Sequence, residues 1–395
     1  MTRRRIVLTT TELRPGGAER CLVDLALGLS PGKYEPLVYV LAPPPPEPQD
    51  GLLNALRRAS IPTHFFHARY SVSLPLVVAR FRARLRQDQP SLVQSFLYHS
   101  HLVSVIANEL WRTAARPRIV AGLRVGGESR FRQAVRRILA RRTDAYVCVS
   151  DDVAHEFETA GGLPGKKLHV IPTGVDGATY ADRSHPVFPP SLGIATGRRL
   201  LLMLGRAGEQ KGSDRLLQGA ARLLRDLPQH DLLCVGPGMR SARSQVLPQL
   251  NRAGIAERVH ACDWFPNVVG LLQVCEILLL PSRWEGFPRV VLEAMAGGLP
   301  VVACDVQGVR QALGELGRAQ IVPAHDFEAF ASRVAELAER SDRIEIGRAN
   351  AQRVADHFSL ARMVAAYERL YDSVLGYPVH DAGSDRHDQL PSCGA

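Results

Sequence analysis

Two glutamates, Glu285 and Glu293, are the residues whose type and spacing first indicate chemistry. They flank the start of a predicted helix that follows a buried apolar strand, Ile277–Leu280. Pro288 suits the first turn of that helix, and Gly297-Gly298 suits its end. Free backbone N–H groups in the loop and first turn, backed by the helix dipole, form an anion site. A diphosphate bound there would leave the two carboxylates to accept hydrogen bonds from sugar hydroxyls.

The spacing of these glutamates is a weak signal by itself, because many helices carry two surface glutamates. The surrounding residues are more specific. Glu285-Gly286-Phe287-Pro288 precedes the helix, and Glu-Ala-Met-Ala-Gly-Gly-Leu-Pro-Val-Val-Ala continues from Glu293 to Ala303. In this context the sequence favours a ligand-binding loop over an ordinary surface helix.

Two cations follow the first apolar run of the second half. Gly205-Arg206 and Gln210-Lys211-Gly212 stand just after Leu200–Leu204. A bound diphosphate is an anion, which two cations and a helix N-terminus would stabilise. The alternative is that both are ordinary surface residues. Cations are unfavourable at a helix N-terminus unless an anion lies between, which counts against that alternative.

Paired glycines, Gly16 and Gly17, follow the first predicted strand within the segment Pro15–Arg20. Glycine lets the backbone approach a ligand closely. A Gly-Gly turn by itself is a weak signal, so its weight comes from the segments described above.

Together with Val149-Ser150 and the stretch from His169 to Asp176, these segments resemble the retaining glycosyltransferases of family 4, which have the GT-B fold. The similarity runs to about residue 375. It implies a nucleotide-sugar donor whose diphosphate is gripped by Arg206 and Lys211, beneath a loop formed by Gly16 and Gly17.

The resemblance also assigns the remaining donor contacts. Glu293 would bind the ribose and Glu285 the transferred sugar. The predicted catalytic residues are Arg206, Lys211 and Glu285, and the predicted donor-binding residues are Gly16, Gly17, Arg206, Lys211, Glu285, Gly286, Phe287, Pro288 and Glu293.

The sequence departs from the family pattern in the first half and in one later turn. Many members have a His at the end of the strand that here ends in Leu123-Arg124. Either Arg124 takes that place, or His99 or His101 reaches the site. Thr173 stands where Asn is usual, and the turn from Gln307 to Arg310 lacks a Glu often found there.

No Asp-x-Asp pair occurs in the chain, so the Mg²⁺ or Mn²⁺ diphosphate clamp of other transferases has no ligands. We therefore expect a metal-independent reaction and no cofactor other than the donor substrate.

Composition is typical of a soluble protein with two domains: 395 residues, 46% of them hydrophobic and 22% charged. No apolar stretch approaches the roughly 18 residues of a membrane-spanning helix, and the N-terminal apolar run is too short for a signal sequence. The seven cysteines are scattered singly, which is typical of buried thiols in a reducing compartment. These features predict a cytoplasmic protein.

Charge is uneven along the chain, whose net charge is +10. Residues 1–190 contain 26 Lys and Arg against 16 Asp and Glu, whereas the remainder contains 23 of each. This asymmetry indicates that the first domain faces something anionic. No aromatic-basic motif of a nucleic-acid-binding module appears.

Short apolar runs alternate with helical patterns along the whole chain, which predicts parallel α/β construction: two Rossmann-like, doubly wound domains facing a cleft. The runs are Arg5–Thr9, Pro36–Leu41, Thr63–Phe66, Leu92–Phe96, Arg118–Leu123, Ala145–Val149 and Leu168–Ile171, then Leu200–Leu204, Leu232–Val235, Val259–Ala261, Ile277–Leu280 and Val301–Ala303.

These patterns divide the chain into five parts. Periodicity is lost over residues 177–199. We expect an acceptor-binding domain over 1–180, a linker over 181–198, a nucleotide-sugar-binding domain over 199–355, a helix crossing back to the first domain over 356–375, and a disordered tail over 376–395.

One basic amphipathic helix is predicted over residues 130–142, with six arginines and with Phe131, Val135, Ile138 and Leu139 on one face. It either attaches the protein to an anionic membrane surface, where a lipid-linked acceptor lies, or packs this face into the core.

The function expected is hexosyl transfer from a UDP- or GDP-sugar to a polysaccharide or lipid-linked saccharide of the cell envelope, with retention. The protein would be cytoplasmic, or peripheral on the inner face of the membrane. Two alternatives are a nucleotide-sugar epimerase on the same fold and a non-catalytic binding module.

Overall fold

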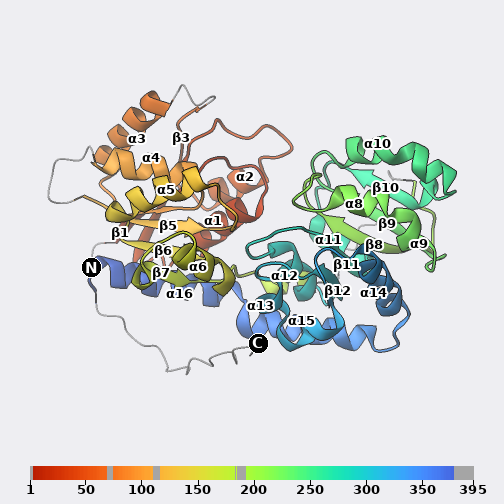
Figure 1. Ribbon diagram of the computed structural model, residues 1–395. Coiled ribbons are helices and arrows are strands. Elements are labelled where there is room, and N and C mark those ends of the chain that lie inside the picture. The colour runs from red at the N-terminus through yellow and green to blue at the C-terminus, as the bar shows by residue number, and fades with distance from the viewer. Residues whose placement is uncertain (1–2, 69–73, 110–115, 183, 185–192, 378–395) are drawn as a thin grey trace.

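The computed structural model describes residues 3–68, 74–109, 116–182, 184 and 193–377. The chain forms two α/β domains side by side, each built on a parallel sheet (Figure 1). This architecture confirms the predicted fold class. The predicted tail lies outside the described residues from position 378 onward, as do residues 183 and 185–192 of the predicted linker.

The first sheet has the strand order β3-β2-β1-β4-β5-β6-β7. Its strands are β1 (Arg4–Thr10), β2 (Tyr34–Val40), β3 (Thr63–Phe65), β4 (Leu92–Ser95), β5 (Arg118–Leu123), β6 (Ala145–Cys148) and β7 (Leu168–Val170). Each corresponds to a predicted run, with ends that agree or differ by no more than two residues. The order reverses at β1, which pairs with both β2 and β4.

The second sheet repeats this arrangement in the order β10-β9-β8-β11-β12-β13. Its strands are β8 (Arg199–Leu204), β9 (His230–Val235), β10 (Val259–Cys262), β11 (Ile277–Leu280), β12 (Val301–Cys304) and β13 (Ile321–Val322). The sequence did not indicate β13, because a pair of residues has no measurable periodicity. The reversal falls between β8 and β11, and ligands of such sheets bind at the carboxyl ends beside this point.

Helices cover both faces of the two sheets. In the first domain they are α1 (Gly17–Gly28), α2 (Gly51–Arg58), α3 (Leu74–Asp88), α4 (Tyr98–Glu109), α5 (Arg130–Leu139) and α6 (Asp151–Thr159). Beyond these come α7 (Gly177–Ala181), α8 (Ser213–Gln218), α9 (Ala220–Leu224), α10 (Met239–Arg252), α11 (Val268–Val274), α12 (Arg289–Ala296), α13 (Val309–Leu313), α14 (Phe327–Glu339), α15 (Arg343–His357) and α16 (Leu360–Leu375).

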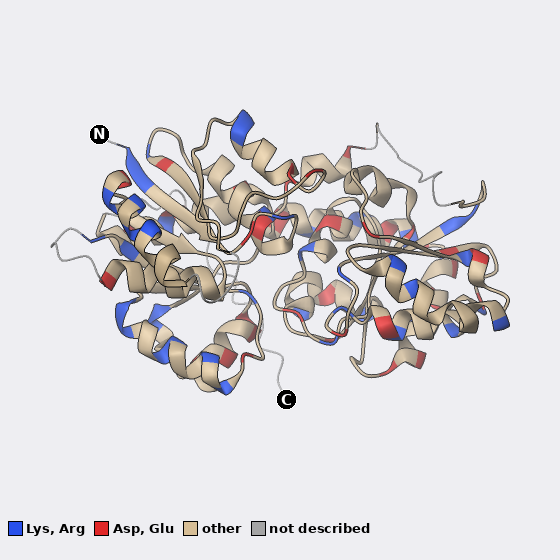
Figure 2. Cartoon of the chain, turned by 90° about the horizontal axis from the view of Figure 1, so that it is seen from above, with Lys and Arg blue, Asp and Glu red and all other residues tan. Residues whose placement is uncertain are grey.

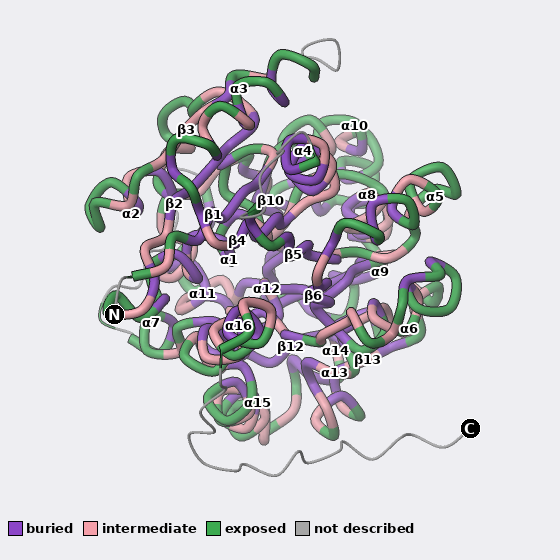
Figure 3. The backbone as a smooth tube through the Cα atoms, turned by 90° about the vertical axis from the view of Figure 1, so that its left-hand side faces the viewer, coloured by how far each residue is buried: buried purple, intermediate pink, exposed green. Residues whose placement is uncertain are grey.

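The strands are mostly apolar because both faces of each sheet are covered, although β4 contains Gln94 and β9 contains Asp231. In β11, no residue is more than 2% exposed. Figure 3 shows the strands buried at the centre and the exposed segments on the surrounding helices. The strands therefore form a fixed base from which the loops at their carboxyl ends project.

The C-terminal helix crosses back to the first domain. Met363, Tyr367 and Tyr371 of α16 join the core that contains Ile6 and Leu22. The single helix predicted over 356–375 was wrong at its start, because α15 extends to His357 and a new helix begins after Ser359. The Ser359 hydroxyl accepts a hydrogen bond from the backbone N–H of Arg362, so it caps α16. Within the stretch that lacks periodicity, α7 forms a short helix.

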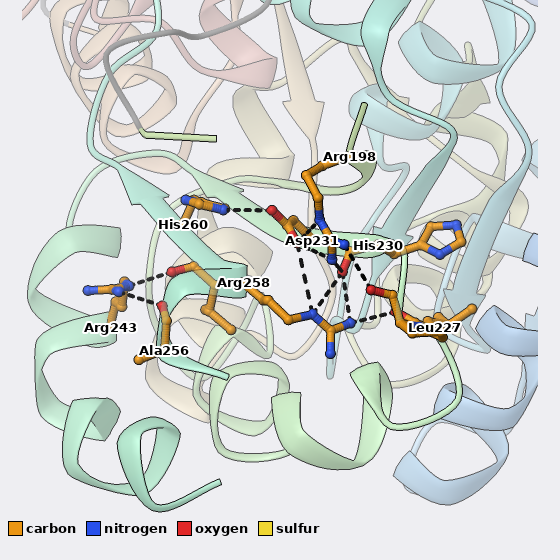
Figure 4. Close-up of polar contacts among 10 residues, drawn as sticks. Arg198, Leu227, His230, Asp231, Arg243, Ala256, Arg258 and His260 are labelled. Carbon is orange, nitrogen blue, oxygen red and sulfur yellow. Dashed lines mark hydrogen bonds and ion pairs between the residues drawn. The ribbon is translucent and has the colours of Figure 1, made fainter. Parts of the chain in front are cut away.

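A charged cluster closes the amino-terminal edge of the second sheet (Figure 4). Arg198 contacts Asp231 at 2.7 Å, and His260 contacts the same carboxylate at 3.1 Å. Arg258 donates to the carbonyl of His230 at 2.9 Å. These guanidinium groups bind backbone carbonyls and a buried carboxylate, so this edge holds the loops between strands together.

Candidate functional site

The loop between β11 and α12 positions the first predicted glutamate. Glu285 is 5% exposed, and its Oε1 accepts a hydrogen bond from the Ser282 hydroxyl at 2.7 Å. Lys211 Nζ lies 2.7 Å from the same oxygen. The structure thus joins Lys211, which is predicted to bind the diphosphate, and Glu285, which is predicted to bind the sugar, in one ion pair. Ser282 was not selected from the sequence, since only the folded loop turns its hydroxyl toward Glu285.

Arg206 and Lys211 extend from the loop after β8. Arg206 is exposed, and no ion pair involving it is recorded in the part of the chain that the structure describes. Gly212 follows with φ +69°, and a Cβ there would lie 1.8 Å from the carbonyl oxygen of Pro281. Only glycine therefore lets the Arg206–Lys211 loop lie against the loop that carries Glu285.

Helix α12 places the second predicted glutamate in its second turn. Pro288 is the N-cap, one residue before the first turn expected for it, and no side chain caps the helix. The first-turn N–H groups therefore have no side-chain acceptor; that of Val291 donates to the Pro288 carbonyl at 3.0 Å, and an anion could accept from the others. Glu293 Oε1 is 2.8 Å from Arg289 Nε. Phe287 is 7% exposed and packs into the core. Its side chain therefore supports the predicted donor loop from the core side.

The paired glycines lie where α1 meets α12. A Cβ on Gly17 would be 3.9 Å from the Cβ of Arg289. A Cβ on Gly16 would be 2.3 Å from Oε2 of Glu19, because the Glu19 carboxylate folds back over the start of α1. The Gly16-Gly17 loop of the first domain thus faces the helix that carries Glu293.

Glu19 is an acidic residue of this site that sequence reasoning missed. It is 8% exposed, and burial raises its pKa to about 7, although its own backbone N–H and the charges of Arg124 and Arg206 oppose the shift. Those two arginines come from different domains. Its position within Pro15–Arg20 was visible in the sequence, but its burial was not, because burial depends on how the chain folds around it.

The first domain contacts the Glu285 loop directly. Ser150 Oγ donates to the carbonyl of Gly286 at 2.8 Å. A Cβ on Gly286 would lie 1.9 Å from the carbonyl oxygen of Arg124, and a Cβ on Gly308 would lie 2.3 Å from the carbonyl of Gly286. Gly286 therefore lets the two domains meet at this point, and Gly308 lets its turn lie against the Glu285 loop within the second domain.

Of the three residues left open for the missing His, Arg124 is the one whose backbone touches the Glu285 loop. Its Nη1 donates to Thr173 Oγ1 at 3.2 Å, and its guanidinium carbon lies 5.0 Å from the centre of the Phe96 ring. His101 is buried in the first domain with Nε2 2.9 Å from Thr143 Oγ1, and burial lowers its pKa to about 3. His99 is exposed on α4.

The turn that lacks the family Glu also joins the two domains. Gln307 Nε2 donates to Glu156 Oε2 at 2.7 Å, and the N–H of Gly308 donates to Asp152 Oδ2 at 2.9 Å. These carboxylates lie on α6 of the first domain. Two acidic side chains from α6 therefore lie beside the turn, which itself lacks the family Glu.

Within the described ranges, no group of three or more His, Cys, Asp or Glu side chains is arranged to hold a metal ion. Of the helices described, none combines the length and apolar character needed to cross a bilayer.

Comparison with known proteins assigns the class. Residues 15–178 match the family model described as Glycosyltransferase Family 4, and residues 198–340 match that described as Glycosyl transferases group 1. The two matches together take in both domains and most of the chain. The chain belongs to the family 4 type of glycosyltransferases with the GT-B fold.

The relatives of the chain have the names of glycosyltransferases with different acceptors. The chain is similar to a D-inositol 3-phosphate glycosyltransferase of Jonesia denitrificans, at 29% identity over 58% of each chain. It is also similar to the lipopolysaccharide core biosynthesis mannosyltransferase LpsB of Rhizobium meliloti, at 27% identity over 60% of this chain and 68% of that one. The match to the Jonesia protein thus spans little more than half of that relative's length.

Solved structures show the same fold. Anabaena Alr3699/HepE in complex with UDP and glucose aligns with a TM-score of 0.78 and 20% identity, covering 94% of this chain and all of that one. Sucrose-phosphate synthase from Thermosynechococcus elongatus aligns with a TM-score of 0.78 and 18% identity, covering 95% and 100%.

Proposed function

We propose that the protein transfers a hexosyl group from a UDP- or GDP-sugar to a polysaccharide or lipid-linked saccharide, with retention of configuration. The observation that carries this proposal is the ion pair of Lys211 with Glu285 at the carboxyl edge of the second sheet, formed by the loop that also carries Arg206. Two cations and a carboxylate that can accept hydrogen bonds are the groups that a sugar diphosphate requires. The names of the relatives support glycosyl transfer, and the UDP bound to HepE supports a nucleotide-sugar donor.

The charges of the site suggest how it would work. A departing nucleotide diphosphate gains negative charge, and Arg206, Lys211 and the first turn of α12 would stabilise it without a metal ion. Lys211 would then exchange its bond to Glu285 for the diphosphate, which frees Glu285 for the hydroxyls of the transferred sugar. Exchange of one anionic partner for another keeps the lysine neutralised before and after donor binding.

Isothermal titration calorimetry against UDP-, GDP- and ADP-sugars tests the proposal. We expect one donor class to bind, together with its free nucleotide diphosphate. Arg206→Ala should bind that donor more weakly, whereas Arg222→Ala, which removes a guanidinium on the far side of the same domain, should not. Failure of the wild type to bind any of these donors would contradict the proposal.

We further propose that α5 attaches the protein to an anionic membrane, on the cytoplasmic side. The apolar face predicted for residues 130–142 is divided: Leu139 is buried, whereas Phe131 and Ile138 are 76% and 69% exposed. The core-facing alternative therefore does not hold for these two side chains. Figure 3 shows α5 at the periphery, and Figure 2 shows basic segments prevailing in the domain that carries the N-terminus.

The exposed residues of α5 fit a lipid surface. Phe131 and Ile138 supply apolar contact, and the exposed Arg130 and Arg141 lie near them. Each arginine near an anionic bilayer contributes about 1 kcal/mol. Arg136 does not take part, because it is buried and paired with Glu128.

Co-sedimentation with vesicles tests the membrane proposal. The wild type should sediment with phosphatidylserine-containing vesicles and not with phosphatidylcholine alone. Phe131→Ser/Ile138→Ser should stay in the supernatant, whereas Ile344→Ser, which removes a 61% exposed apolar residue from the second domain, should sediment like the wild type. Equal recovery of the wild type in the supernatant with both vesicle types would contradict the proposal.

A further inference from the structure

Arg289, the first residue of α12, joins the two domains at the proposed nucleotide site. Its side chain is 8% exposed. Nε lies 2.8 Å from Glu293 Oε1 in the same helix, and Nη2 lies 2.7 Å from Asp24 Oδ2 in α1. Nη1 donates to the carbonyl of Gly174 at 3.3 Å. One guanidinium group therefore contacts its own helix in the second domain, α1 of the first domain and the segment that follows β7.

Four charges balance in this cluster. Arg20 and Arg289 oppose Asp24 and Glu293, and the Tyr180 hydroxyl lies among them. Burial raises the pKa of Asp24, and Arg289 and Arg20 act against that rise. Because an unpaired buried charge is strongly destabilising, Asp24 and Arg289 hold each other in place.

The consequence falls on Glu293. A glutamate side chain in the second turn of a helix samples several rotamers, and ordering it on ligand binding costs affinity. Here the bond from Arg289 to Oε1 fixes the carboxylate before a ligand arrives. Asp24 in turn fixes Arg289, although it lies in the other domain.

We propose that Asp24 and Arg289 are positioning residues that orient Glu293 for the ribose of the donor, so that the nucleotide affinity of the second domain depends on a carboxylate of the first. This role rests on the proposed function. It assigns no contact with the donor to Asp24 itself.

The test is calorimetric titration of the full chain with the nucleotide diphosphate, UDP or GDP, that the wild type binds. Asp24→Asn keeps the shape of the side chain and removes its charge, and we expect roughly tenfold weaker binding, the size of one charge-assisted hydrogen bond. Arg289→Lys should give a similar loss, since an ammonium cannot hold both carboxylates in the fork geometry of a guanidinium.

Asp372→Asn is the matched control. Asp372 is 5% exposed, contacts Arg4 at 2.9 Å and accepts from the Tyr34 hydroxyl at 2.8 Å, far from α12 at the amino-terminal edge of the first sheet. Its loss should lower the melting temperature without changing nucleotide affinity. A general effect of losing a buried ion pair would weaken binding in this variant too, and would overturn the positioning role.

A double-mutant cycle identifies the route of the effect. In a Glu293→Gln background, Asp24→Asn should cause no further loss of affinity. Wild-type affinity in both Asp24→Asn and Arg289→Lys, or losses that add fully to that of Glu293→Gln, would overturn the positioning role while leaving the proposed function intact. Absence of nucleotide binding by the wild type would instead contradict the proposed function and this role with it.

Discussion

Two glutamates at different edges of the molecule have opposite pKa shifts. In Glu19, at the cleft, burial raises the pKa to about 7. In Glu276, at the amino-terminal edge of the second sheet, burial also acts to raise the pKa, but hydrogen bonds from His230 and Arg199 lower it to about 2. The same residue type therefore costs stability at one edge and contributes stability at the other. The raised pKa of Glu19 fits an edge whose charges stay available for an anionic ligand. The lowered pKa of Glu276 fits an edge whose charges are already paired within the protein.

Loss of a cleft cation should have the largest effect on activity. Arg206→Ala and Lys211→Ala should each lower turnover about 10²–10³-fold, or roughly 2–4 kcal/mol of transition-state stabilisation. Initial rates with the donor identified by calorimetry measure this. Arg198→Ala, at the closed edge, should lower the melting temperature and leave the turnover of folded protein unchanged. Full turnover in both Arg206→Ala and Lys211→Ala would contradict the catalytic role of these two cations.

The two predicted donor glutamates should differ in what they bind. Glu293→Ala should weaken binding of the free nucleotide diphosphate roughly tenfold or more, because hydrogen bonds to a charged group contribute about 1.5–3 kcal/mol. Glu285→Ala should leave that affinity nearly unchanged and impair use of the whole sugar donor. Calorimetry with both ligands separates the roles. Equal losses of nucleotide affinity would show that the division of roles is wrong.

Glu19 should make the protein less stable as pH rises. Its folded pKa of about 7 lies above the ordinary 4.5, so the folded state binds the extra proton between these values and the cost is complete above pH 7. Glu19→Gln should stabilise the protein on the order of 1–3 kcal/mol at pH 8 and give no gain near pH 4. Urea unfolding at both pH values measures this, and a gain of equal size at both would point to a cause other than titration.

Glu276 should show the reverse dependence with a smaller size. Its folded pKa of about 2 lies below 4.5, so its contribution is present above pH 4.5 and is lost as pH falls toward 2. Glu276→Gln should lower stability by about 1–2 kcal/mol at pH 7, a value reduced for partial exposure to solvent. Unfolding of both proteins at pH 7 and pH 3 tests it. A variant as stable as the wild type at pH 7 would contradict the lowered pKa.

Chelation should have the smallest effect of all. Excess EDTA should leave transfer activity unchanged, because the cleft cations, and not a metal ion, are proposed to neutralise the diphosphate. The control is the same assay with Mn²⁺ added back. Activity abolished by EDTA and restored by Mn²⁺ would place a metal at the cleft.

Several elements could be predicted closely from the sequence, and particular residues show why. The run Ile277–Leu280 and the strand Arg118–Leu123 have the bounds predicted for them, because buried parallel strands are short apolar runs ended by turn residues. The break at Ser359 was missed because helical periodicity continues on both sides of it. For the helix over 130–142, the pattern gave the amphipathic character but not the direction in which Phe131 and Ile138 point.

The sequence by itself determined the class of the protein, the order of its strands along the chain and the residues proposed to bind the donor. The order of the strands follows from the apolar period and from glycine and proline at turns, whereas the class and the donor residues follow from the resemblance of these segments to family 4. Only the tertiary structure decided that Lys211 pairs with Glu285, that Glu19 is buried and that Arg289 links Glu293 to Asp24. Each of these depends on residues far apart in the chain meeting at one edge, where burial and pairing, and not residue type, set the charge.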